Sequence, residues 1–439
     1  MRTPRLLQFG FARESAWILA FRVTSLGAGL LVTILLTRAL GARGYGIYSY
    51  AFAIVSLLSL PAQSGLPILL MRETAKNVAT DRPDLVRGVW LWTGRAATAI
   101  SMALLVGGVI VVLATSGGEL DVRDWTLLLA FVLVPLLALG NLRGAALRGL
   151  ERVLAGTMPE YVIRPITFVI VLAVLAFTAG QYTPAEAMGI HVFAAALAFA
   201  VGAIMLWRRT PDDVRQAAPR YEARPWLLSA LPLALITGMM TINGYADIIM
   251  LGIFESDETV GIYRVAVQVS ALVSLGMEAV NMVIAPRFAS LYAKRDLSQL
   301  QRLASGSARV VLIASVGAGL AFLAVGRQLL DIVFGVEFVA AFVPTLILMA
   351  GGLVNSAAGS TGYLLNMTGH ERDEAKVVTI AAILNLVLNL LLIPLLGAVG
   401  AAIATAVSYA VWRSWLWRYV RRRLGINSSA FAKTSDPGP

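Results

Sequence analysis

Long apolar runs separated by short polar segments recur along the whole chain of 439 residues. Each run is about as long as the roughly 20 residues that an α-helix needs to cross the hydrocarbon core of a bilayer. A transmembrane β-barrel would instead show strict apolar and polar alternation in segments of about ten residues. The pattern therefore predicts an all-α integral membrane protein with about twelve spans. Their approximate ranges are 15–37, 46–69, 88–114, 125–147, 157–179, 186–207, 226–253, 260–286, 308–325, 338–365, 375–396 and 398–419.

One segment of the chain occurs twice. GYGIYSYAFAIVSLLS at 44–59 is similar to TVGIYRVAVQVSALVS at 259–274, so the tripeptide Gly-Ile-Tyr ends at Tyr48 in one copy and at Tyr263 in the other. In both copies it stands where the first outer loop of a six-span half meets the second span. Because six is even, both halves start on the same side, as in transporters built from parallel repeats. We expect two pseudo-symmetric six-helix lobes.

A polar, proline-containing segment, RRTPDDVRQAAPRYEAR at 208–224, separates the two halves. We therefore predict an N-terminal lobe at 1–207, a cytoplasmic linker at 208–224 and a C-terminal lobe at 225–424. The remaining residues, 425–439, are predicted to be a disordered cytoplasmic tail.

Composition and charge agree with a membrane protein. Charged residues make up 14% of the chain and hydrophobic residues 58%, whereas soluble domains carry about 25% charged residues. The outer loops hold only four basic residues: Arg38, Arg43, Arg123 and Arg327. Most other arginines and lysines lie in the inner segments, and this positive-inside bias places both termini in the cytoplasm. The net charge of +11 therefore faces anionic headgroups, and nucleic acid binding is the poorer explanation.

Two further features limit the chemistry. The chain has no cysteine and two histidines, His191 and His370, so disulfides and thiolate metal sites are excluded and a histidine metal site is disfavoured. The apolar run at 16–36 is longer than the roughly 7–15 residues of a signal-peptide core. We expect it to be the first span rather than a cleaved signal.

Four stretches resemble the polysaccharide-export branch of the multidrug/oligosaccharidyl-lipid/polysaccharide (MOP) superfamily, the Wzx-type flippases. They are LLTRALGARGYGIYSYAFAIVSLLSLPAQSGLPILLMRETAK, GAALRGLERVLAGTMPEYVIRPI, FGVEFVAAFVPTLILMAGGLVNS and NLVLNLLLIPLLGAVGAAIATAVSYAVW. The resemblance covers essentially the whole chain. It implies a MATE-like pair of six-helix lobes around a cavity that opens alternately to each side of the membrane.

The resemblance also implies a function. Such a protein moves undecaprenyl-pyrophosphate-linked oligosaccharide from the inner to the outer leaflet of the bacterial cytoplasmic membrane, for O-antigen, capsule or exopolysaccharide. Its partners are the lipid-linked oligosaccharide, membrane lipids and an assembly with a polysaccharide polymerase and glycosyltransferases. No cofactor or catalytic residue is expected, and Na⁺ or H⁺ is the expected coupling ion.

A pyrophosphate headgroup needs cationic side chains within the spans, where ionisable residues are costly unless they face a cavity or a partner. Arg22, Arg95, Arg164 and Arg264 are the candidates, because guanidinium groups bind phosphate bidentately and stay charged. The alternative for each is snorkelling to the interface or a structural ion pair. Arg164 follows Glu160 by four residues, which favours an ion pair between them.

The ion-coupling candidates are Asp247, with Asn243 one turn earlier on the same face, and Glu278 in the middle of the predicted span 260–286. A carboxylate at these positions could bind Na⁺ or a proton, or could instead form a structural pair. Asn385 and Asn389, one turn apart, resemble the family's paired asparagines, and interhelical hydrogen bonding is their expected role. His191 is expected to be a core or pore-lining residue rather than a proton relay.

Two other functions compete with flipping. One is a multidrug or metabolite cation-coupled antiporter on the same fold, although a cationic cavity disfavours cationic drugs. The other is a membrane-embedded glycan polymerase or ligase. Such an enzyme needs a catalytic surface outside the membrane, and the outer loops are short and carry no pair of acids or nucleophile constellation. We therefore expect a transporter and not an enzyme.

Overall fold

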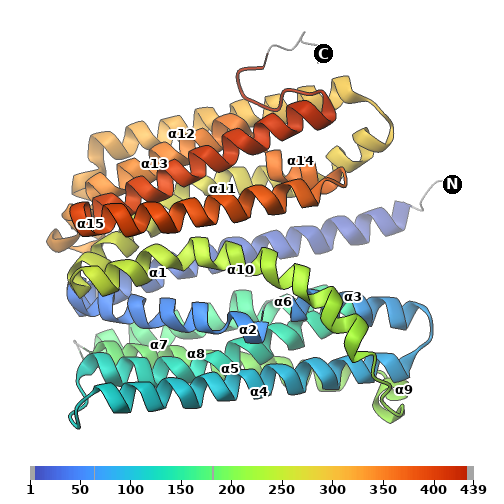
Figure 1. Ribbon diagram of the computed structural model, residues 1–439, viewed down its shortest axis with the longest axis horizontal. Coiled ribbons are helices and arrows are strands. Elements are labelled where there is room, and N and C mark those ends of the chain that lie inside the picture. Colours follow the sequence, from blue (N-terminus) through green and yellow to red (C-terminus); the bar gives the residue numbers. More distant parts are fainter. Residues whose placement is uncertain (1–4, 64, 180–181, 433–439) are drawn as a thin grey trace. The chain divides into compact units, whose positions relative to one another are not determined.

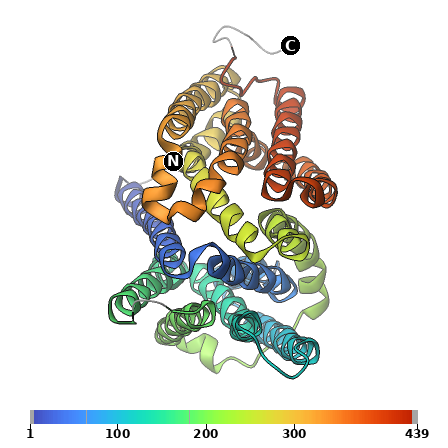
Figure 2. The same cartoon turned by 90° about the vertical axis from the view of Figure 1, so that its left-hand side faces the viewer.

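All the secondary structure is helical, without strands, over the residues that the computed structural model describes, which are 5–63, 65–179 and 182–432. The chain forms two compact units, Met1–Thr241 (unit 1) and Ile242–Pro439 (unit 2), and the boundary between them falls inside helix α10. Figure 1 labels the helices, and Figure 2 looks along the helices of each unit.

Unit 1 contains seven long helical segments and several short ones. They are α1 (Arg5–Leu58), α2 (Leu60–Gln63), α3 (Leu66–Ala79), α4 (Pro83–Thr115), α5 (Val122–Gly149), α6 (Val153–Met158), the π-helix η1 (Pro159–Ile163), α7 (Arg164–Ala179), α8 (Pro184–Arg209), α9 (Asp212–Gln216) and the first part of α10 (Ala223–Phe254).

Unit 2 continues from the second part of α10. It consists of α11 (Asp257–Ala293), α12 (Leu297–Phe334), the 3₁₀-helix η2 (Val336–Ala341), α13 (Phe342–Ala358), α14 (Thr361–Met367) and α15 (Glu371–Leu424).

Two of the long helices change direction at a glycine. Gly41 interrupts α1 with φ 66° and ψ −175°, and Gly397 interrupts α15 with φ 54° and ψ −130°. A residue with a Cβ atom is strained at such angles, so glycine allows the reversal. In Figure 1 the two halves of α15 lie next to each other and run in opposite directions. Each glycine lies between two predicted spans, so the sequence pattern separated these halves correctly.

Nine helices in the described ranges are long and apolar enough to cross a membrane. Two of them, Val23–Leu58 and Asp373–Leu424, contain a reversal glycine, and each overlaps two of the twelve predicted spans. The protein is therefore a multi-pass membrane protein. The count of twelve spans and the cytoplasmic position of both termini stay predictions.

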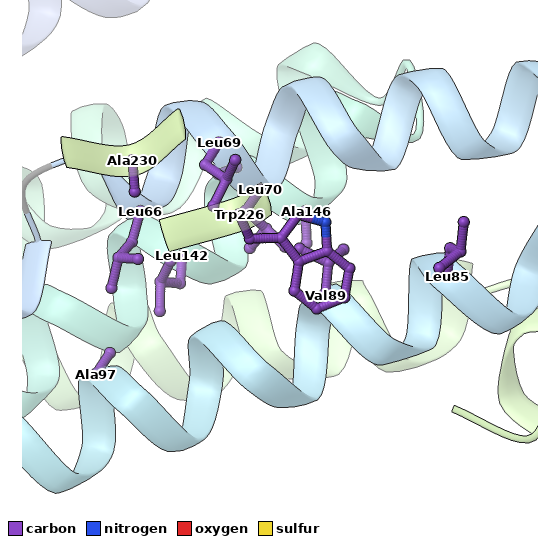
Figure 3. Close-up of a cluster of buried hydrophobic side chains, with 11 residues drawn as sticks. Leu66, Leu69, Leu70, Leu85, Val89, Ala97, Leu142, Ala146, Trp226 and Ala230 are labelled. Carbon is purple, nitrogen blue, oxygen red and sulfur yellow. The ribbon is translucent and has the colours of Figure 1, made fainter. Parts of the chain in front are cut away.

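Each unit has its own apolar core. In unit 1 the core joins α3, α4, α5 and the start of α10, where Trp226 and Ala230 pack against the leucines of α3 (Figure 3). In unit 2 the core joins α11, α12, α14 and α15 around fully buried residues such as Phe288 and Leu364. Burial of this apolar surface is the main favourable contribution to the stability of each unit.

The polar linker at 208–224 lies against the start of α4. The amide of Arg220 donates to the Asp84 carbonyl at 3.0 Å, and Arg87 Nη1 donates to the Ala217 carbonyl at 2.8 Å. A Cβ atom on Gly88 would lie 1.8 Å from the Arg220 carbonyl oxygen, so the close approach depends on this glycine.

The segment that follows α15 differs from the expected disordered tail. Residues 425–432 pack against unit 2, and Ile426 and Ser428 are buried. Arg309 of α12 donates from Nε to the Ala430 carbonyl at 2.8 Å, and Ser428 Oγ donates to the Ala358 carbonyl at 3.1 Å. These long-range contacts satisfy the segment's polar groups, so its polar composition does not leave it unfolded. Residues 433–439 of the expected tail lie outside the described ranges.

Candidate functional site

A buried carboxylate lies in unit 2. Asp247 of α10 is 5% exposed, and Tyr263 of α11 donates a hydrogen bond from its hydroxyl to Asp247 Oδ2 at 2.5 Å. The amide of Ile248 donates to Asp247 Oδ1 at 2.8 Å. Arg264, which is half-buried on α11, acts electrostatically on the same carboxylate. A charged group buried in a membrane protein requires such partners.

The polar contacts continue from Tyr263 into α15. The Tyr263 hydroxyl is hydrogen-bonded with Thr405, and Asn385 Nδ2 donates to Thr405 Oγ1 at 3.3 Å. Asn389 Nδ2 in turn donates to Asn385 Oδ1 at 3.0 Å. The bond from Asn385 to Thr405 joins the two halves of α15, and it bears out the interhelical role expected for Asn385.

We call the side chains of Asp247, Tyr263, Thr405, Asn385 and Asn389 the acid network. Asn389 is fully buried, and its Oδ1 atom has no hydrogen-bond partner among the described residues. The network thus offers carboxylate, hydroxyl and amide oxygens and one unsatisfied acceptor. Oxygen atoms are the ligands that hard cations prefer, and a carboxylate can also take a proton. Across the described ranges, no group of three or more His, Asp or Glu side chains is arranged to hold a metal ion.

A second cluster lies in unit 1, where one carboxylate contacts two guanidinium groups. Arg143 of α5 donates from Nη2 to Glu160 Oε1 at 3.2 Å, and Arg164 Nη1 lies 3.3 Å from Glu160 Oε2. The second contact is the ion pair that the spacing of Glu160 and Arg164 favours. We call Arg143, Glu160 and Arg164 the arginine cluster. It carries one more positive than negative charge.

The neighbouring backbone shapes this cluster. Arg143 is 5% exposed and also donates from Nη1 to the carbonyls of Ala198 and Phe199 on α8, both at 2.8 Å. A Cβ atom on Gly202 would lie 2.2 Å from Arg143 Cζ, so a larger residue would displace the guanidinium. Glu160 lies on the π-helix η1, and π-helical turns occur frequently at functional sites.

Near this cluster, His191 of α8 is buried among aromatic rings. Its Nδ1 atom lies 2.8 Å from the Tyr48 hydroxyl, and its ring stacks on Phe168 with a centroid distance of 4.6 Å. Burial confirms the expected core position. Tyr48 and Tyr263 are equivalent residues of the repeated segment, so both copies bring a tyrosine hydroxyl to a buried titratable group.

The other predicted site residues are found in different surroundings. Arg95 is exposed on α4 and donates from Nη1 to the Tyr221 hydroxyl at 3.4 Å, while Asn243 is half-buried on α10, one turn before Asp247. Arg22 lies on α1 and Glu278 on α11, and the side chains of both lie outside the described part of the structure. Among the described candidates, Arg264 and Asp247 are brought together, whereas Arg95 and Arg164 have separate partners.

Arg143 and Arg413 are not among the site residues that the sequence predicts. Arg143 falls within the predicted span 125–147, and an ionisable residue inside a span is the signal that could have found it. Arg413 lies near the end of the predicted span 398–419, and the structure stacks it on Trp412 at 4.2 Å to the ring centroid. The charge of Glu374 acts on Arg413, so this arginine has an acidic neighbour within unit 2.

Comparison with known proteins agrees with the resemblance seen in the sequence. Residues 11–292 match the family model described as polysaccharide biosynthesis protein. The chain belongs to this family. The match covers more than half of the chain, and it supports a flippase of the MOP type.

Two curated relatives are archaeal. The chain is 24% identical over 404 residues to the probable low-salt glycan biosynthesis flippase Agl15 of Haloferax volcanii, covering 91% of this chain and 81% of that protein. It is 26% identical over 412 residues to the probable flippase AglR of the same organism, covering 90% and 80%.

Solved structures share the fold. An inward-facing multidrug resistance MATE family transporter of the MOP superfamily superposes with a TM-score of 0.74 at 13% identity, covering 91% of this chain and 94% of that chain. The lipid II flippase MurJ in an inward closed conformation superposes with a TM-score of 0.73 at 13% identity, covering 92% and 87%. The fold is therefore that of the MOP superfamily.

Proposed function

We propose that this protein flips a lipid-linked oligosaccharide from the inner to the outer leaflet of a membrane. Membership of the polysaccharide biosynthesis family and the similarity to two probable flippases support this assignment. The structural observation that carries it is the pair of buried polar groupings within the spans, the arginine cluster in unit 1 and the acid network in unit 2. One suits an anionic headgroup, and the other suits a coupling ion.

The arginine cluster suits a pyrophosphate because its positive charge exceeds its negative charge. Glu160 holds Arg143 and Arg164 at once, and the Arg164 side chain is 27% exposed. A phosphate oxygen can therefore replace Glu160 at Arg164, while the contact with the buried Arg143 keeps the carboxylate in place. Arg22, Arg95 and Arg264 remain candidates for further contacts with the headgroup. The carrier in this proposal is a polyprenyl pyrophosphate.

The acid network suits ion coupling because its residues come from α10, α11 and both halves of α15. A cation or proton on Asp247 weakens the hydrogen bond that the Tyr263 hydroxyl donates to that carboxylate. The packing of these helices then depends on ion occupancy, and this dependence is what couples an ion gradient to alternating access. Asn243, one turn from Asp247, and Glu278 are the further coupling candidates. Na⁺ and H⁺ are the two ions to test.

The cellular setting follows from the sequence resemblance. In this proposal the protein resides in the bacterial cytoplasmic membrane and serves the synthesis of O-antigen, capsule or exopolysaccharide beside a polymerase and glycosyltransferases. It acts as a transporter without catalytic residues. The alternative is a cation-coupled antiporter, favoured by the shared fold with a multidrug transporter. The excess positive charge of the arginine cluster argues against cationic drugs as its cargo.

The test is a flipping assay in proteoliposomes with a fluorescent polyprenyl-pyrophosphate oligosaccharide, scored by the accessibility of the label from outside. The wild-type protein should move the label across the membrane. Arg164→Ala should slow transfer by more than tenfold, and Arg164→Lys should restore part of it. Arg208→Gln, at the exposed end of α8, is the charge-matched control. Wild-type transfer no faster than in protein-free vesicles, together with export of cationic dyes, would establish the antiporter instead.

A further inference from the structure

A basic pocket lies in unit 2 between the last turns of α11 and the first turns of α12. Its volume is about 570 Å³, within the usual range of roughly 300–1,000 Å³ for small-ligand sites. The lining residues are Arg287, Ser290, Leu291, Gln299, Arg302 and Leu303. None of them belongs to the acid network, so the flipping proposal leaves this pocket unexplained.

Two guanidinium groups face the pocket from different helices. Arg287 comes from α11 and Arg302 from α12, and both side chains are exposed. Lys294 and Arg295, in the turn that joins the helices, add two more positive charges nearby. Guanidinium groups bind phosphate oxygens bidentately, so two of them at one pocket suit a phosphate group.

Asp296 is the acid next to these arginines, and its carboxylate already accepts hydrogen bonds from its own chain. It caps α12, because the amide of Gln299 and the hydroxyl of Ser298 both donate to its Oδ1 atom at 2.9 Å. These hydrogen bonds hold the pKa of Asp296 below its usual value. The carboxylate therefore accepts its hydrogen bonds from the first turn of α12. With one acid beside four basic residues, the net charge around the pocket is positive.

A turn hydrogen bond and core packing join the two helices that line the pocket. The amide of Asp296 donates to the Leu291 carbonyl at 3.0 Å, and this bond closes the turn between the two helices. On the same two helices, Phe288 of α11 and Leu300 of α12 are fully buried in the core of unit 2. Arg287 and Arg302 thus extend from two helices that are packed together, so a ligand does not have to order the helices themselves.

The predicted topology sets this pocket at the inner side of the membrane, where the headgroups of anionic lipids lie. Leu291 and Leu303 add an apolar wall beside the two arginines, as expected for a group that has an acyl chain attached. Basic pockets between transmembrane helices on the cytoplasmic side bind anionic headgroups. We propose that this pocket binds the phosphodiester headgroup of an anionic phospholipid of the inner leaflet.

The test uses the full-length protein in phosphatidylcholine vesicles that contain a small fraction of acyl-chain spin-labelled phosphatidylglycerol. Electron paramagnetic resonance measures the motionally restricted fraction of the labelled lipid, and spin-labelled phosphatidylcholine gives the baseline. The wild-type protein should prefer phosphatidylglycerol. Arg287→Gln with Arg302→Gln should weaken that preference by about tenfold to thirtyfold, because both guanidinium groups that face the bound headgroup are lost.

Two control variants separate this site from general surface charge. Arg287→Lys with Arg302→Lys should keep most of the preference and shows that the fold is intact. Arg208→Gln with Arg209→Gln removes two exposed charges from the end of α8 and should leave the preference unchanged. Equal losses in the two glutamine pairs, or no preference in the wild type, would overturn the proposal.

A competition experiment shows whether the bound phosphate belongs to a phospholipid or to a soluble compound. Millimolar glycerol phosphate should leave the restricted lipid fraction nearly unchanged, because the membrane holds the headgroup at a far higher local concentration. Full displacement by glycerol phosphate would assign the pocket to a soluble phosphate compound and refute the lipid assignment. The assay measures lipid association alone, so its outcome is independent of whether the protein flips an oligosaccharide.

Discussion

Tyr263 donates a hydrogen bond to Asp247 at 2.5 Å, and both side chains are buried in unit 2. Its counterpart in the repeated segment, Tyr48, lies 2.8 Å from His191 in unit 1. In each copy of Gly-Ile-Tyr the tyrosine hydroxyl therefore contacts a buried titratable side chain, but the partner differs. An acid is the partner in unit 2 and an aromatic-caged histidine in unit 1, which favours unit 2 as the ion-coupled half.

Replacing Asp247 with Asn should uncouple transport from the ion gradient. The amide keeps the size of the side chain and can still bond to Tyr263, but it can neither take a proton nor neutralise a cation. We expect the flipping rate in proteoliposomes to become independent of an imposed Na⁺ or proton gradient. Separate Na⁺ and pH gradients identify the ion.

Tyrosine variants serve as the matched controls for this experiment. Tyr263→Phe should keep the gradient dependence but shift the ion concentration that gives half-maximal rate, because the carboxylate loses a competing donor. Tyr48→Phe removes the equivalent hydroxyl from unit 1 and should leave that concentration unchanged. A gradient response in Asp247→Asn equal to that of the wild type would assign Asp247 a structural role.

Replacing Glu160 with Gln should destabilise unit 1 strongly. The substitution leaves the guanidinium of Arg143, which is 5% exposed, without its counter-charge. Breaking a buried ion pair in this way costs about 3–5 kcal/mol. Arg164→Gln should cost only about 0–1 kcal/mol, because its side chain is partly exposed and the remaining pair is intact. Unfolding of the purified protein in mixed detergent–SDS micelles measures the free energy that each variant loses. Similar losses in the two variants would mean that the buried pair of Arg143 and Glu160 is no more important for stability than the pair of Arg164 and Glu160.

The sequence was informative where the signal is local. The spacing of Glu160 and Arg164 within one helical region indicated their ion pair, and Asp247 stood out as a charge inside an apolar run. The position of Arg143 inside the predicted span 125–147 marks it as unusual, but the sequence does not indicate its surroundings, because the glycine that makes room for its guanidinium, Gly202, lies on another helix. The packed segment at 425–432 was missed for the same reason, since its hydrogen-bond partners lie on α12 and α13.

Gly397 should be intolerant of alanine. Its φ of 54° and ψ of −130° are angles at which a residue with a Cβ atom is strained, at a cost of about 1–3 kcal/mol. We therefore expect Gly397→Ala to lower the midpoint of thermal unfolding. Gly317 on α12 has open space around an added Cβ atom and lies within a regular helix, so Gly317→Ala should be neutral or slightly stabilising. Equal midpoints for the two variants would mean that the reversal at Gly397 does not require glycine.

The segment after α15 should contribute to the stability of unit 2 through particular side chains. Ile426 is 2% exposed and packs in the core of α11, α12, α14 and α15, whereas Phe431 is 77% exposed. Ile426→Ala should therefore cost about 2–5 kcal/mol, because it leaves a cavity in that core. Phe431→Ala should change stability by no more than about 0.5 kcal/mol, as surface substitutions usually do. Detergent-micelle unfolding of the two variants measures the difference. If Ile426→Ala unfolded at the wild-type midpoint, the segment would be only loosely attached, and its hydrogen bonds to Arg309 and Ala358 would not hold it in place.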